Sequence, residues 1–75
     1  MTASIHPSAV VDAGAELGDG VVAGPGAVIQ GGVRIGAGCH IGPNAVLYSG
    51  VTLGRDCRVH AGAVLGDTPQ DLSFS

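Results

Sequence analysis

IGAGCH-IGPNAV, residues 35–46, consists of two copies of one six-residue unit. Each copy has an aliphatic residue, a glycine, two turn-forming residues, a small apolar residue and a variable residue. A period of six does not match the 3.6-residue period of an amphipathic helix, so no such helix is predicted here. A short fixed period is instead typical of a solenoid, in which each unit buries its apolar face against the units stacked on it.

The same unit continues without insertion from Ile5 to Leu65. Every sixth residue in this range is apolar, and all but one of them are Ile, Leu or Val. Four places after each of these residues except Leu65 stands Ala, Val or Cys, so a second position of the unit is small and apolar from Ala9 to Ala63. Of the 14 glycines, all but Gly31 occupy the second or fourth place of a unit, and Asn44 and Asp56 fill the fourth place in their units. Because these residue types tolerate positive φ, we expect a tight turn near the fourth place of each unit.

The remaining triplet of each unit alternates inward, outward and inward, which is the geometry of a β-strand. Three units then close a triangular coil of 18 residues, the coil of the left-handed parallel β-helix known for hexapeptide repeats. The handedness is taken from that likeness, since parallel crossovers usually have the opposite hand. We therefore predict an all-β, left-handed parallel β-helix of about three to four coils. It would form one domain, residues 1–75, with repeats over 5–65 and a loop or ragged end over 66–75.

Composition and charge exclude several classes of function. The formal net charge is −3 with three Lys and Arg, which provides no electrostatic footprint for nucleic acid. No segment approaches the roughly 20 consecutive apolar residues that membrane insertion requires. The first four residues contain neither the basic nor the apolar region of an export signal, so a cytoplasmic location is expected.

One outward column is entirely valine. It consists of Val10, Val28, Val46 and Val64. The other two outward faces are mixed and carry Glu16, Arg34, Thr52 and Gln70 on one, and Val22, His40 and Arg58 on the other. A one-sided apolar stripe indicates a buried surface, and we predict a homotrimer packed through it. The alternative is that valine serves only as a good strand former.

The cysteines and histidines are interpreted as structural and surface residues. Cys39 and Cys57 are 18 residues apart and would be small core residues in adjacent coils, rather than a disulfide. His6 and His60 share an outward column but lie three coils apart, roughly 14 Å. His40 projects from a different face. The sequence therefore predicts no metal site and no cofactor, and no catalytic residue is visible.

The sequence resembles a known family of acyltransferases in its first and last segments. The segment Ile5–Val10 (IHPSAV), the uninterrupted hexads and above all residues 66–74 (GDTPQDLSF) are similar to acyl-[acyl-carrier-protein]–UDP-N-acetylglucosamine O-acyltransferase. The hexads are shared with many hexapeptide transferases, whereas the PQDL segment is specific. The resemblance covers the whole chain, but only the N-terminal coils of a longer family member.

This resemblance implies the first step of lipid A biosynthesis. A 3-hydroxyacyl chain would move from acyl carrier protein to the 3-hydroxyl of UDP-N-acetylglucosamine, and those two molecules would be the partners. Asp71 matches a family residue that lines the substrate site, Gln70 is a further substrate-binding candidate, and Ser73 stands where the family has Lys. The family's general base is a His in a later coil, so these 75 residues are expected to be inactive alone.

Two other interpretations stay open. The chain could be a non-catalytic β-solenoid scaffold or oligomerisation module, or it could belong to another hexapeptide-repeat acyltransferase. For Asp71 the alternative is a solvated carboxylate in a C-terminal tail.

Overall fold

We analysed a computed structural model, which describes residues 3–66. Within this range the regular structure consists of short parallel strands of two residues each. The strands are β1 (Ser4–Ile5), β2 (Val10–Val11), β3 (Glu16–Leu17), β4 (Val22–Ala23), β5 (Val28–Ile29), β6 (Arg34–Ile35), β7 (His40–Ile41), β8 (Val46–Leu47), β9 (Thr52–Leu53), β10 (Arg58–Val59) and β11 (Val64–Leu65).

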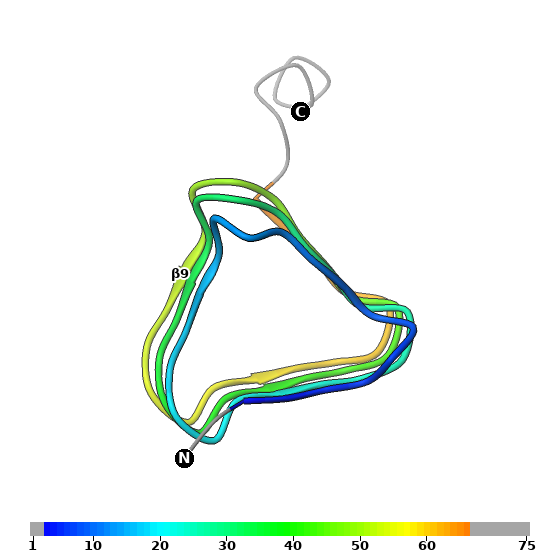
Figure 1. The fold of residues 1–75 in the computed structure, drawn as a ribbon, viewed down its shortest axis with the longest axis horizontal. Helices are drawn as coiled ribbons and strands as arrows, with labels where there is room; N and C mark the ends of the chain where they lie inside the picture. Colours follow the sequence, from blue (N-terminus) through cyan, green and yellow to red (C-terminus); the bar gives the residue numbers. More distant parts are fainter. Residues whose placement is uncertain (1–2, 67–75) are drawn as a thin grey trace.

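The strands form the three walls of a triangular prism (Figure 1). Their order is β1-β4-β7-β10 in the first wall, β2-β5-β8-β11 in the second and β3-β6-β9 in the third; we call these the β1, β2 and β3 faces. Each strand from β1 to β8 pairs in parallel with the strand one coil further on, and the paired residues are 18 apart, as in Val28↔Val46. The 18-residue coil predicted from the repeat is therefore confirmed.

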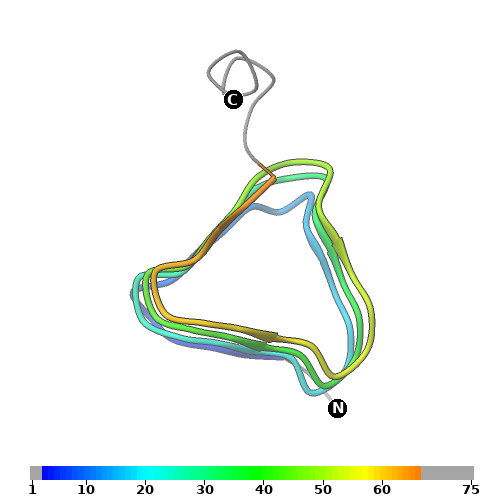
Figure 2. The ribbon, with the colours of Figure 1, turned by 180° about the vertical axis from the view of Figure 1, so that it is seen from behind.

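The prism is left-handed, as predicted from the hexapeptide likeness. In Figure 1 the chain winds anticlockwise while it recedes from its N-terminal coil, and Figure 2 shows the C-terminal coil nearest the viewer from behind. Short corners replace the long crossovers that impose the usual right hand on parallel strands.

The inside of the prism is filled by the two apolar columns of the repeat. Eleven of the described residues are buried, all from the aliphatic or the small apolar place of a unit: Val21, Ala23, Ala27, Ile29, Val33, Ile35, Cys39, Ile41, Ala45, Leu47 and Val59. All of them except Val59, which lies in the end strand β10, belong to the middle of the stack, where a coil is covered on both sides. Ile5 occupies an aliphatic place in the first coil and is 43% exposed, because only the coil above it covers it.

The corners follow the fourth-place prediction from residue 20 onward. Every fourth-place residue from Gly20 to Gly62 has positive φ, including Asn44 at 60° and Asp56 at 59°. The first two corners, at Ser8 and Gly14, also have the predicted tight turn, but neither residue has positive φ. There the side chain two residues earlier accepts the fourth-place N–H: His6 Nδ1 accepts from Ser8 at 3.0 Å, and the Asp12 carboxylate accepts from Gly14 at 2.8 Å. A side-chain acceptor thus holds these two corners in place of a left-handed residue.

The regular coil changes directly after Leu65, where the sequence repeat also ends. Gly66 has a φ of +77°, although it stands in the second place of a unit, and no earlier residue in that place has positive φ. Val51 and Tyr48 flank Gly66 so closely that a Cβ there would meet the Val51 side chain. The chain therefore leaves the hexad path at Gly66.

Candidate functional surfaces

The predicted substrate residues Gln70, Asp71 and Ser73 lie outside the described residues. The part of the chain that leads to them starts at the corner formed by residues 12–14, 30–32 and 48–50. In this corner Ser49 donates hydrogen bonds from its backbone N–H to Gln30 Oε1 at 3.2 Å and from its hydroxyl to the Gly31 carbonyl at 2.5 Å. These hydrogen bonds join two successive coils at the corner from which the chain continues to the predicted substrate residues.

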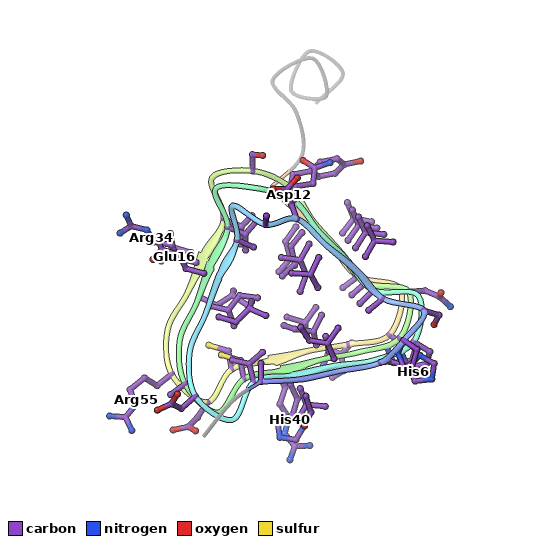
Figure 3. All side chains as sticks on the ribbon, viewed as in Figure 1. His6, Asp12, Glu16, Arg34, His40 and Arg55 are labelled. Carbon is purple, nitrogen blue, oxygen red and sulfur yellow. The ribbon has the colours of Figure 1, made fainter. Side chains whose placement is uncertain are left out.

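The valine stripe is continuous along the β2 face. Parallel pairing in register joins Val10 to Val28, Val28 to Val46 and Val46 to Val64. The outer members are exposed, Val10 by 61% and Val64 by 51%, whereas each inner valine is half-buried between its neighbours. Figure 3 shows side chains stacked in a row outside the upper right wall. The structure confirms the position of the stripe, and its role as an interface stays a prediction.

Three basic side chains gather on the β1 face. Arg58 of β10 pairs in register with His40 of β7, and His60 follows two residues after Arg58. All three are exposed and line one hollow of about 320 Å³ together with Val22. No carboxylate lines this hollow. Figure 3 shows His40 projecting outward from this wall. The repeat pattern predicts all three residues on the surface but does not predict that His60 lies beside the other two.

The β3 face carries a pair of oppositely charged side chains in register, where the β1 face has two basic ones. Arg34 of β6 lies beside Glu16 of β3, with 3.7 Å between Arg34 Nε and a carboxylate oxygen of Glu16. Both side chains are 70% exposed, so water screens this ion pair and its contribution to stability is small.

His6 and Ser8 form a hydrogen-bonded pair that the sequence analysis missed. The Ser8 hydroxyl lies 2.9 Å from His6 Nδ1 and accepts a hydrogen bond from the Gly26 N–H of the next coil at 3.0 Å. The sequence does contain a signal for this pair. Ser8 stands at a fourth place without being Gly, Asn or Asp, so its corner departs from the pattern of the repeat. Since the same imidazole nitrogen also accepts the Ser8 N–H, the pair fixes the first corner and its stacking on the second coil.

Among residues 3–66, no group of three or more His, Cys, Asp or Glu could hold a metal ion. Cys39 is buried and Cys57 is half-buried, and both are free thiols in the core, as predicted. Cys39 Sγ donates a hydrogen bond to the Gly54 carbonyl at 2.9 Å. No helix suited to crossing a membrane occurs in the described range.

Comparison with known families gave one family model. The model described as bacterial transferase hexapeptide (six repeats) matches residues 14–48 and again residues 32–67. The two matches together span more than half of the sequence and cover the prism from β3 to β11. A comparison with curated proteins gave no significant match.

Proposed function

The chain belongs to the bacterial hexapeptide transferase family, and from this premise we propose that it forms the N-terminal coils of a lipid A acyltransferase. The reaction is transfer of a 3-hydroxyacyl chain from acyl carrier protein to the 3-hydroxyl of UDP-N-acetylglucosamine. The observation that carries the proposal is the segment GDTPQDLSF at residues 66–74, which follows the last hexad directly. Leu65 ends the final strand and Gly66 turns the chain away, so this segment begins where the scaffold stops.

In the proposed reaction these 75 residues contribute substrate contacts, and the catalytic base lies elsewhere in the active site. A base takes the proton of the sugar hydroxyl, whose oxygen attacks the thioester carbonyl; the carrier thiol leaves and an ester forms. Asp71 and Gln70 are the proposed sugar-nucleotide contacts, and Ser73 alters the contact that a Lys makes in the resembling family. No residue of the 75 is assigned the role of base, so we expect the chain alone to bind without turnover.

The proposed assembly is a cytoplasmic homotrimer packed through the valine stripe. Four valines in adjacent coils form a continuous apolar row, and the neighbouring β3 face presents charged and polar side chains instead. Burial of the row in a subunit interface would remove this apolar surface from water. Each Å² of apolar surface buried in this way stabilises the assembly by about 25 cal/mol.

Binding of UDP-N-acetylglucosamine tests the proposal. We expect saturable binding by ligand-observed NMR, about tenfold weaker binding in Asp71→Ala, and no effect of Asp19→Ala, a carboxylate in a corner of the prism. Incubation with 3-hydroxyacyl carrier protein as well should give no acylated sugar nucleotide. Binding that is unchanged in Asp71→Ala would contradict the substrate assignment.

A scaffold is the second candidate function. Within residues 3–66, the strands at each end of the stack have one edge without a strand partner, and unpaired edges favour end-to-end association. Filaments that lengthen with protein concentration in electron micrographs, together with no binding of the sugar nucleotide, would favour this scaffold over the transferase.

A further inference from the structure

The β1 face holds a basic hollow to which neither the family nor the proposed reaction assigns a role. Parallel strands are about 4.8 Å apart, so the in-register pair places the bases of the His40 and Arg58 side chains at that spacing. Two basic side chains thus lie directly opposite each other on neighbouring strands, where side chains of opposite charge would stabilise the sheet. The comparable place on the β3 face is instead occupied by the oppositely charged pair Glu16 and Arg34.

Arg58 differs from Arg34 in its charged neighbours among residues 3–66. In this range Glu16 forms an ion pair with Arg34, whereas no carboxylate forms an ion pair with Arg58. The second imidazole, that of His60, lines the same hollow and brings further ring nitrogens that can form hydrogen bonds. A chain with a formal charge of −3 thus concentrates one arginine and two histidines at one place.

We propose that His40, Arg58 and His60 bind the phosphate group of a small phosphate monoester. The guanidinium has five N–H donors and each protonated imidazole has two, which suits the several oxygens of a phosphate better than the two of a carboxylate. The hollow of about 320 Å³ has room for a phosphate and part of the group that it esterifies.

The apolar part of this ligand has a neighbouring place on the same face. Val22, 37% exposed, lines the basic hollow and also a second hollow of about 350 Å³, which is lined further by Ile5 and Pro25. A short alkyl or aryl group attached to the phosphate would extend over Val22 toward Ile5. The β1 face is not the valine face, so this site does not depend on the proposed trimer or acyl transfer.

Histidine NMR of the full chain tests the proposal with inorganic phosphate as the first probe. In mildly acidic, low-salt buffer, phosphate should shift the imidazole C–H signals of His40 and His60 saturably and leave that of His6 nearly unchanged. Arg58→Ala should weaken binding by about tenfold or more, as expected for the loss of a charge-assisted hydrogen bond. The matched control is Arg55→Ala, which removes an exposed arginine at a different corner.

Two further probes define the ligand class. Acetate should bind at least about tenfold more weakly than phosphate, and butyl phosphate should bind more tightly than inorganic phosphate through contact with Val22. Equal weakening by Arg55→Ala and Arg58→Ala would overturn the site, because it would reveal non-specific attraction of anions. Acetate binding as tight as that of phosphate would overturn the phosphate assignment. Circular dichroism of each variant should match the unmodified chain, since all the exchanged side chains are exposed.

Discussion

The side-chain oxygen of Asn44 occupies the place that a Cβ on Gly26 would take. Asn44 lies one coil above Gly26, at the same corner, and both have positive φ: 60° for Asn44 and 72° for Gly26. A non-glycine residue is thus accommodated at one level of this corner, and its side chain lies over a glycine below. Asp56 and Gly38 repeat the arrangement at the next corner.

Gly26→Ala should therefore destabilise the prism through two separable effects. The left-handed backbone costs alanine about 1–2 kcal/mol, and displacement of the Asn44 side chain adds about 0.5–1.5 kcal/mol. Gly20→Ala is the matched control, because Gly20 has a φ of +74° and open space around its Cβ position. Chemical unfolding should show the larger loss for Gly26→Ala.

A double-mutant cycle isolates the contact between the two residues. In the Asn44→Gly background, Gly26→Ala should cost no more than Gly20→Ala does in the unmodified chain. If the cost of Gly26→Ala were the same with and without Asn44, the side-chain contact would play no part in the stability of this corner.

Gly36→Ala tests how closely the backbones of successive coils approach. A Cβ on Gly36 would lie 2.7 Å from the carbonyl carbon of Gly54 in the next coil, and a backbone cannot move aside as a side chain can. We expect a loss of about 3 kcal/mol, at the upper end for an overpacked site. Gly54→Ala is the control at the same place of the next coil, where none of residues 3–66 lies within 4 Å of the added Cβ, and it should change stability by less than about 0.5 kcal/mol. Similar losses in both variants would contradict the close-approach explanation.

Much of this fold could be predicted from the sequence because the repeat acts on two scales. The period of six determines which side chains face inward, and the period of 18 determines which of them stack, as in Val28 over Val10. Handedness could not be derived in this way, because an inward-outward pattern is the same for either hand. The conformation of the first two corners was also not predicted, since hydrogen bonds accepted by the side chains of His6 and Asp12 hold them without a left-handed residue.

The candidate surfaces were predicted less completely than the core. The valine stripe was found because its members share a residue type and a period. The basic hollow was missed because His40 and Arg58 belong to a strand column, while His60 belongs to a corner column. Residues that belong to different columns of the repeat can still lie side by side where the chain turns at a corner, and the repeat pattern does not predict such neighbours. Asp71 was assigned from resemblance alone, and it lies outside the described residues.

The valine stripe predicts a change of oligomeric state on mutation. Val28→Glu combined with Val46→Glu places two carboxylates in the centre of the row, and their desolvation in an interface would be too costly for association. Light scattering should give a trimer mass for the unmodified chain and a monomer mass for this double variant. Val22→Glu combined with Thr52→Glu is the control, with the same number of new charges on the other two faces. A trimer mass for both double variants would exclude the stripe as the interface.

The two core thiols should react at different rates. Cys39 is fully buried and donates its S–H to the Gly54 carbonyl, whereas Cys57 is half-buried one coil further on. Because a thiol reagent must reach the sulfur, Cys57 should be labelled first, and Cys39 only when the prism opens. Labelling with an aromatic disulfide reagent should show a fast and a slow phase of equal amplitude. Cys57→Ala should remove the fast phase and Cys39→Ala the slow one, while denaturant should merge the two. A single rate for both thiols under native conditions would mean that the second and third coils separate readily, and that Cys39 is no better protected than the half-buried thiol beside it.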